Sequence, residues 1–153
     1  MMLPRDRSFW LIAAAIAIVV LVTLIDLLRA SHMLNTWLSL LGVLLMLGGG
    51  LLRELGAHAL GQQLSYAVKV PKKLIRTGIY ARIRHPMYAG AALLGLGAIA
   101  ALASLYGLLA VVLTLLPALL YRIKVEEDML KKQFGKEYEE WASKTSRLIP
   151  GLL

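Results

Sequence analysis

Long stretches of apolar residues with almost no charge constrain the fold of this chain more than any other feature of its sequence. Three stretches, Ser8–Leu28, Leu34–Leu52 and Pro86–Tyr121, contain a single charged residue, Asp26. At about 1.5 Å per residue in a helix, each of the first two can cross a hydrocarbon layer of roughly 30 Å, and the third suits two shorter helices. Hydrophobic residues make up 59% of the chain, more than the core of a soluble domain of this length requires. The surplus must therefore face lipid.

We predict an all-α membrane protein with one domain over residues 1–153, formed by a small bundle of four transmembrane helices at residues 8–28, 34–52, 86–104 and 105–121. The first stretch is too long for the apolar part of a signal peptide, and Arg29 and His32 follow it in place of a small-residue cleavage pattern. Because no charged linker separates the last two helices, we expect a tight hairpin near Ser104–Gly107. Pro117 predicts a kink in the fourth helix.

Basic residues are concentrated in two regions outside these stretches. Residues 53–87 contain seven Lys and Arg against one acid, and residues 122–153 contain seven basic and six acidic residues. By the positive-inside rule both regions, and hence both termini, face the cytoplasm. The net charge of +8 does not indicate nucleic-acid binding, because such proteins display their charge on a polar surface that this chain mostly lacks. The absence of cysteine excludes disulfides, thiolate nucleophiles and cysteine-ligated metals.

Residues 123–141 have the pattern of an amphipathic C-terminal helix. Its apolar side chains recur at helical spacing: Ile123, Leu130, Phe134, Tyr138 and Trp141. Glu127 falls near the centre of this apolar stripe and Glu126 at its flank, where an unpaired charge is costly to bury. Arg122 lies one turn before Glu126, so the two side chains share a face and can bracket a ligand. The simpler interpretation is that the glutamates form ion pairs with Arg122, Lys131 or the basic loop.

Five consecutive residues, Arg84 to Tyr88, mark the start of the third helix. Pro86 lacks an amide hydrogen and its fixed φ suits the first helical turn, while it biases His85 toward an extended backbone. The N-terminal end of this helix, beside Arg84 and His85, can bind an anion such as an amino-acid carboxylate. The alternative is structural: Arg84 is a positive-inside residue, His85 a polar group at the helix start and Tyr88 an interfacial aromatic.

Small residues recur along the third helix at Ala91, Gly95, Gly97 and Ala101. Gly-Leu-Gly within an apolar helix lacks the preceding strand that a dinucleotide site needs, so these residues predict close helix packing. The three histidines are scattered along the chain, and the sequence contains neither a metal-binding histidine motif nor a Ser-His-Asp order. We therefore expect no metal site.

Two motifs become specific when they are read together: R-T-G-I-Y-A-R-I-R-H-P-M-Y-A-G at residues 76–90 and E-E-D-M-L-K-K-Q-F-G-K-E-Y at residues 126–138, followed by L-I-P at residues 148–150. They resemble the isoprenylcysteine carboxyl methyltransferase family and its bacterial phospholipid-methyltransferase-like relatives. The resemblance covers about residues 53–150 and includes a segment with Arg53, Ala57, Leu60 and Gly61. It implies a helical membrane enzyme that binds S-adenosylmethionine in a cytoplasmic pocket, and a bacterial inner membrane as its location.

The resemblance also implies roles for individual residues. S-adenosylmethionine would be bound by Leu74, Ile75, Tyr80, His85, Pro86, Met87, Tyr88, Glu126 and Glu127. Arg122, the predicted catalytic residue, would face the methyl acceptor and orient an anionic head group without moving a proton. Lys72 and Lys73 stand where eukaryotic members usually have a histidine, so a prenylcysteine substrate is not implied. The expected acceptor is lipophilic or membrane-associated, with a carboxylate, amine or thiol as the nucleophile.

Two other classes of function are compatible with the sequence. Some sterol and steroid reductases share a similar R-H-P-x-Y region and use NADPH, although those chains are generally longer, and a non-catalytic membrane scaffold would keep the helices alone. The expected partners are the lipid bilayer and a lipophilic acceptor, with no nucleic acid. The small-residue helix faces leave the oligomeric state open.

Overall fold

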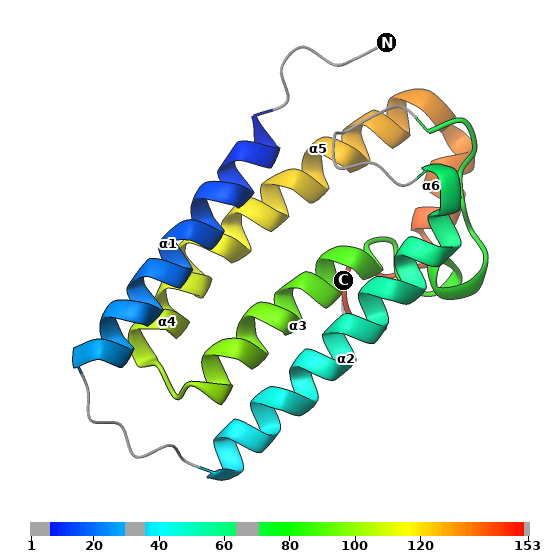
Figure 1. Cartoon of the computed structure of the whole chain (residues 1–153). Coiled ribbons are helices and arrows are strands. Elements are labelled where there is room, and N and C mark those ends of the chain that lie inside the picture. The colour runs from blue at the N-terminus through cyan, green and yellow to red at the C-terminus, as the bar shows by residue number, and fades with distance from the viewer. Residues whose placement is uncertain (1–6, 30–35, 64–70, 152–153) are drawn as a thin grey trace.

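The structure, a computed structural model, describes residues 7–29, 36–63 and 71–151, and its regular elements are helices (Figure 1). They are α1 (Ser8–Arg29), α2 (Thr36–Leu60), the 3-10 turns η1 (Gly61–Gln63) and η2 (Gly78–Ala81), α3 (Pro86–Ala101), α4 (Leu105–Ala110), the π-helical turn η3 (Val111–Leu115), α5 (Leu116–Phe134) and α6 (Lys136–Ala142). Within the described ranges, the one β-type pairing is a parallel bridge between Ile83 and Ser146. The predicted all-α class is confirmed.

Within the described part of the chain, three helical stretches are long and apolar enough to cross a membrane: Ser8–Leu28, Thr36–Leu60 and Leu105–Phe134. The predicted third span at residues 86–104 is shorter, because α3 ends after 16 residues, about 24 Å. The chain turns at Ala103, which has a φ of +51°, and the Ser104 hydroxyl then accepts the amide hydrogen of Gly107 to start α4. By length alone, α3 falls short of a full span of about 30 Å.

Several other predicted boundaries are corrected by the structure. The helix expected to end at residue 52 continues through Arg53 to Leu60. The helix expected to end at residue 121 continues to Phe134, because α4, η3 and α5 form one helical stretch. The predicted amphipathic helix is interrupted at Gly135, whose φ of +52° separates α5 from α6. Near Pro117, where a kink is predicted, the described irregularity is the π-helical turn η3, which ends two residues before the proline; the kink itself stays a prediction.

α2 and α3 pack closely side by side through glycines (Figure 1). The buried glycines of α2 recur every seven residues, at Gly42, Gly49 and Gly56. A Cβ on Gly42 would lie 2.3 Å from the backbone nitrogen of Ala101, and a Cβ on Gly90 would lie 2.5 Å from the carbonyl oxygen of Gly49. The two backbones therefore touch, as the small residues of the third helix predicted.

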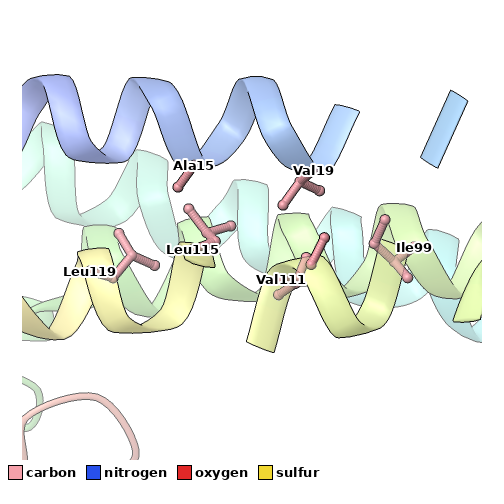
Figure 2. Packing of buried hydrophobic residues seen from close by; sticks show 7 residues of the cluster. Ala15, Val19, Ile99, Val111, Leu115 and Leu119 are labelled. Atoms are coloured by element: carbon pink, nitrogen blue, oxygen red, sulfur yellow. The ribbon is translucent and has the colours of Figure 1, made fainter. Parts of the chain in front are cut away.

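α1 packs on the other side of the bundle, against α4, η3 and α5. The core on this side is a cluster of buried apolar side chains, to which α3 contributes Ile99 (Figure 2): Ala15, Val19, Ile99, Ala110, Val111, Leu115 and Leu119. Three polar residues of α1, Ser8, Thr23 and Asp26, are also buried, since polar side chains of a membrane helix favour protein over lipid. Ser104 Oγ donates a hydrogen bond of 2.5 Å to Asp26 Oδ2, which ties α1 to the α3–α4 turn.

One end of the bundle collects the polar segments of the chain. The start of α1, the end of α2, the start of α3 and the end of α5 all lie at this end, together with α6 (Figure 1). Residues that are far apart in the sequence, among them the motif before α3 and the acidic motif of α5, therefore meet there.

Candidate active site

A cavity of about 840 Å³ lies between α1 and α3 and reaches the polar end of the bundle. Apolar side chains form most of its wall, for example Phe9, Ile16 and Leu27 of α1, Met87 and Leu94 of α3, and Leu102 directly after α3. On α1 the lining extends from Phe9 to Leu27, about 27 Å of helix. Polar groups line its other part: Arg53, Arg84, His85, Tyr88, Arg122 and Glu126. A long apolar channel with a polar end suits an amphiphilic ligand.

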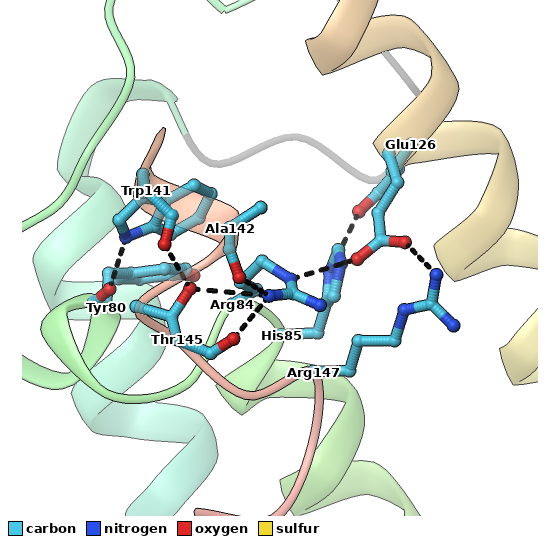
Figure 3. A network of polar contacts seen from close by, with 9 residues as sticks. Tyr80, Arg84, His85, Glu126, Trp141, Ala142, Thr145 and Arg147 are labelled. Carbon is cyan, nitrogen blue, oxygen red and sulfur yellow. Dashed lines mark hydrogen bonds and ion pairs between the residues drawn. The ribbon is translucent and has the colours of Figure 1, made fainter. Parts of the chain in front are cut away.

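The segment before α3 is held by the C-terminal segment of the chain. The amide of Arg84 donates to the Ser146 carbonyl at 2.8 Å, and the amide of His85 donates to the Arg147 carbonyl at 3.0 Å. The Arg84 guanidinium adds hydrogen bonds to the carbonyl oxygens of Ala142 and Thr145 (Figure 3). The last described residues therefore fix the backbone from which α3 begins.

Glu127 connects this pairing to α5. Its Oε1 accepts a hydrogen bond from Arg84 Nε at 3.1 Å, and its Oε2 lies 2.8 Å from Nη2 of Arg147. The side chains of Glu127 and Arg84 are only 11% and 10% exposed. We call Arg84, Glu127 and Arg147 the polar clamp. The clamp explains how an acid can occupy the apolar stripe of α5, because its charge is paired and hydrogen-bonded where it is buried.

Arg122, Tyr88 and Glu126 form a second polar group, at the wall of the cavity. Tyr88 donates its hydroxyl hydrogen to Glu126 Oε1 at 2.5 Å, and Arg122 Nε donates to the Tyr88 hydroxyl at 3.1 Å. Arg122 Nε also lies 3.4 Å from Glu126 Oε1. The Arg122 side chain is only 4% exposed, whereas that of Glu126 is 23% exposed. The cavity thus has an acid and a guanidinium side by side, each held by the same tyrosine.

His85 stands between the two acids at the start of α3. Its Nδ1 lies 3.8 Å from Glu126 Oε2, and its Nε2 lies 3.4 Å from Glu127 Oε1. The ring is buried, and within the described residues its Nε2 makes no hydrogen bond. Nε2 faces Glu127 of the polar clamp and Nδ1 faces Glu126 at the cavity wall, so His85 connects the two polar groups.

The remaining wall near the polar end is aromatic. Leu74, Tyr80, Tyr138 and Trp141 form a buried cluster, in which Trp141 Nε1 donates to the Tyr80 carbonyl at 2.9 Å (Figure 3). Burial raises the pKa of the Tyr80 hydroxyl far above its usual value, and the charge of Glu126 adds to that rise. Burial likewise raises the pKa of Tyr138, with Glu127 contributing. Both phenols therefore stay protonated to a higher pH than a free tyrosine does.

Most of the residues that the sequence analysis proposed for the site lie on the cavity wall: Leu74, Ile75, Tyr80, His85, Met87, Tyr88, Arg122 and Glu126. Two do not. Pro86 is buried where it starts α3, and Glu127 belongs to the polar clamp behind His85. The alternative of ion-paired glutamates describes some of the contacts, since Glu126 pairs with Arg122 and Glu127 with Arg84 and Arg147. Lys131 pairs with Glu139 instead.

The sequence analysis missed the contribution of α1. An evenly apolar helix does not reveal which of its faces lines a cavity, so the apolar lining residues of α1 left no periodic signal. The polar residues of α1 did contain a signal that could have been used. Ser8, Thr23 and Asp26 are all buried, so they mark the face of α1 that turns to the protein. Arg147 was missed because no helical or strand periodicity extends to it.

Comparison with known proteins gives a consistent result. The family model of phospholipid methyltransferases matches residues 37–137. A probable protein-S-isoprenylcysteine O-methyltransferase of Oryza sativa subsp. indica is 30% identical over 74% of this chain and 62% of its own length. The Saccharomyces cerevisiae protein-S-isoprenylcysteine O-methyltransferase is 34% identical over 82% of this chain and 54% of its own length. The chain therefore spans little more than half of these relatives.

The fold also has a solved counterpart. It superposes on the eukaryotic intramembrane Ras methyltransferase isoprenylcysteine carboxyl methyltransferase with a TM-score of 0.65 and 24% sequence identity. The superposition covers 98% of this chain and 55% of the other. The helical arrangement around the cavity is therefore one that a membrane methyltransferase also has.

Proposed function

The chain belongs to the phospholipid methyltransferase family, and from this premise we propose that it transfers a methyl group from S-adenosylmethionine to a lipophilic or membrane-associated acceptor. One observation carries the proposal. A single cavity joins an apolar channel between α1 and α3 to a polar end with an acid, a histidine and an arginine. Such a cavity can bring a polar methyl donor and a lipophilic acceptor together.

The residues of the polar end fit the chemistry of S-adenosylmethionine, which has a carboxylate, an ammonium, ribose hydroxyls and a sulfonium-bound methyl group ready for transfer. Glu126 would bind the ammonium or the ribose hydroxyls. The imidazole of His85, which lines the cavity, and the start of α3 offer a place for the carboxylate. Tyr80 and Tyr88 would stack on the adenine or face the sulfonium. Leu74, Ile75 and Met87 supply the apolar contacts around these groups.

Arg122 would hold the acceptor. Its guanidinium is nearly buried at the cavity wall, where water screens its charge poorly and an anionic head group is strongly attracted. A planar guanidinium also orients a carboxylate through two parallel hydrogen bonds. Methyl transfer requires the nucleophile to be aligned with the methyl group in a dry site, and an anionic acceptor needs no general base. We therefore assign Arg122 to alignment of the acceptor.

The apolar channel indicates where the acceptor comes from. α1 and α3 line it along most of the bundle, and the outer faces of α1 and α2 carry many exposed apolar side chains that suit lipid. An acceptor dissolved in the bilayer would place its tail between α1 and α3 and its head group at Arg122. The names of the relatives, which are isoprenylcysteine O-methyltransferases, support a carboxylate acceptor with a lipid tail. An amine or a thiol acceptor is compatible with the same channel.

The proposed topology places the polar end, and with it the site and both termini, on the cytoplasmic side of a bacterial inner membrane. In this topology the three long apolar helices and the shorter α3 would make the four passes. Single cysteines introduced at Val70 and Thr145 should be labelled by a membrane-impermeant maleimide only after the cells are opened. Labelling of either position in intact spheroplasts would contradict this topology.

Calorimetric titration of the purified protein with S-adenosylhomocysteine tests the function directly. We expect a saturable binding heat with S-adenosylhomocysteine and none with NADPH, because the polar end matches the former. Binding of NADPH alone would favour a membrane reductase, and binding of neither would indicate a scaffold without this activity.

A further inference from the structure

α1 lies outside residues 37–137, which the family model matches, yet it reaches the most buried polar group of the site. Ser8 is the first residue of α1, and its relative exposure is 0%. Its Oγ accepts a hydrogen bond from Nη1 of Arg122 at 2.8 Å, across 114 positions of sequence. A buried contact between the start of one helix and the middle of another is a specific restraint on both.

Among the described residues, Arg122 has partners on α1, α3 and α5. Its Nε donates to the Tyr88 hydroxyl of α3 at 3.1 Å and lies 3.4 Å from Glu126 Oε1 of α5. Its Nη1 donates to Ser8 of α1. Because Nε and Nη1 lie at different positions of a rigid plane, contacts at both atoms fix the rotation of the guanidinium as well as its location. Within the described ranges, Ser8 supplies a restraint at Nη1.

We propose that Ser8 is a positioning residue, which holds the Arg122 guanidinium in the plane that aligns the methyl acceptor. The proposal rests on the proposed function, because it assigns Arg122 to the acceptor. Ser8 itself need not touch the acceptor. Its absence should leave the methyl-donor part of the site intact, since Glu126, His85 and Tyr88 are held by contacts of their own. The consequence is a loss of turnover without a loss of donor binding.

The test compares two variants of nearly equal shape, Ser8→Thr and Ser8→Val, which share the added bulk and differ in the hydroxyl. Ser8→Ala removes the hydroxyl without added bulk and serves if both larger side chains impair folding. Ser39→Ala is the matched control, because Ser39 Oγ donates to the Ala101 carbonyl at 2.9 Å and ties α2 to α3 away from the cavity. Binding of S-adenosylhomocysteine shows that each variant is folded.

Turnover is measured with S-adenosylmethionine and N-acetyl-S-farnesylcysteine as the acceptor. We expect Ser8→Val and Ser8→Ala to lower kcat about 10- to 100-fold, since a small misplacement of an aligning group has effects of this order, while the Kd of S-adenosylhomocysteine changes less than about twofold. Ser8→Thr should retain most of the wild-type kcat. Ser39→Ala should lower the Tm and leave kcat unchanged.

A second readout does not depend on the choice of acceptor. The Nε–Hε signal of Arg122 in protein with ¹⁵N-labelled arginine, assigned through Arg122→Lys, should keep its position in Ser8→Thr and move in Ser8→Val and Ser8→Ala. Equal kcat values or equal Arg122 signals in Ser8→Thr and Ser8→Val would overturn the role of Ser8. Failure of the wild-type protein to bind S-adenosylhomocysteine would instead overturn the proposed function, and the role of Ser8 with it.

Discussion

Two contacts hold the walls of the cavity together, and they do so by opposite means. Along α2 and α3, glycines let two backbones touch, and the contact consists of close packing without charge. At the polar end, the polar clamp joins α5 to the C-terminal segment through a buried acid and two arginines. The packed contact sets the distance between two helices, whereas the clamp sets the position of single side chains. The clamp, and not the glycine contact, lies directly behind His85 of the candidate site.

The largest effect on stability should come from breaking the polar clamp. Glu127→Gln leaves the Arg84 side chain, 10% exposed, without its carboxylate, and we expect a loss of about 3–5 kcal/mol in the free energy of unfolding. Glu137→Gln is the control, because Glu137 pairs with Arg76 where both side chains are 47% exposed, and such a pair contributes about 0–1 kcal/mol. Chemical denaturation in detergent micelles measures both. Equal losses in the two variants would mean that the clamp is no more than a surface contact.

Substitutions in the glycine contact should change the free energy of unfolding less, and the change should depend on the size of the new side chain and not on its charge. Gly42→Ala places a Cβ against the backbone of Ala101, and we expect a loss of about 1–3 kcal/mol. Gly48→Ala is on the same helix with open space around its Cβ position, so it should stabilise the protein by about 0.5–1 kcal/mol through the backbone entropy of glycine. Thermal unfolding followed by circular dichroism separates the two. Opposite signs support the close approach of α2 and α3, and a common sign argues against it.

A smaller effect, on the binding of S-adenosylhomocysteine, should distinguish His85, which lies beside the polar clamp, from the exposed basic residues. His85→Ala should weaken binding of S-adenosylhomocysteine about tenfold, the equivalent of one hydrogen bond to a charged group. Arg82→Ala should change it little, because Arg82 is exposed and other basic residues replace its charge. Calorimetry of both variants is the measurement. Equal losses of affinity in the two variants would mean that the basic residues before α3 only orient the protein in the membrane.

The sequence predicted the apolar helices and the polar end, but not the contacts that join them. Uncharged stretches indicated the spans because the bilayer leaves few other options for an apolar segment. The glycines of α3 indicated close packing because small residues let two helix backbones approach each other in a membrane. The turn expected near Ser104–Gly107 comes slightly earlier, at Ala103, so that α3 ends at Ala101. Local pattern could not assign Glu127 to Arg84 and Arg147, because these partners come from segments that only the complete fold brings together.

Most of the predicted site residues lie at the cavity wall. They belong to two motifs at the polar end of the bundle, one at the start of α3 and one in α5, and the predicted topology already brought these ends together. Glu126 and Glu127 show the limit of such reasoning. They are adjacent in sequence, yet one faces the cavity and the other faces the clamp. Their side chains point in directions about 100° apart around α5. Which of the two faces the cavity depends on the segments that pack against α5, and these are not visible in the local sequence.

The central claim is that two residues of the polar end have separate roles: Glu126 binds the methyl donor and Arg122 aligns the acceptor. Binding of S-adenosylhomocysteine and turnover of S-adenosylmethionine with N-acetyl-S-farnesylcysteine, measured separately for Glu126→Gln and Arg122→Ala, test it most directly. We predict that Glu126→Gln raises the Kd about tenfold or more, and that Arg122→Ala leaves the Kd within about twofold while turnover falls below detection. Parallel losses of binding and turnover in both variants would contradict the claim and reduce Arg122 and Glu126 to a structural ion pair.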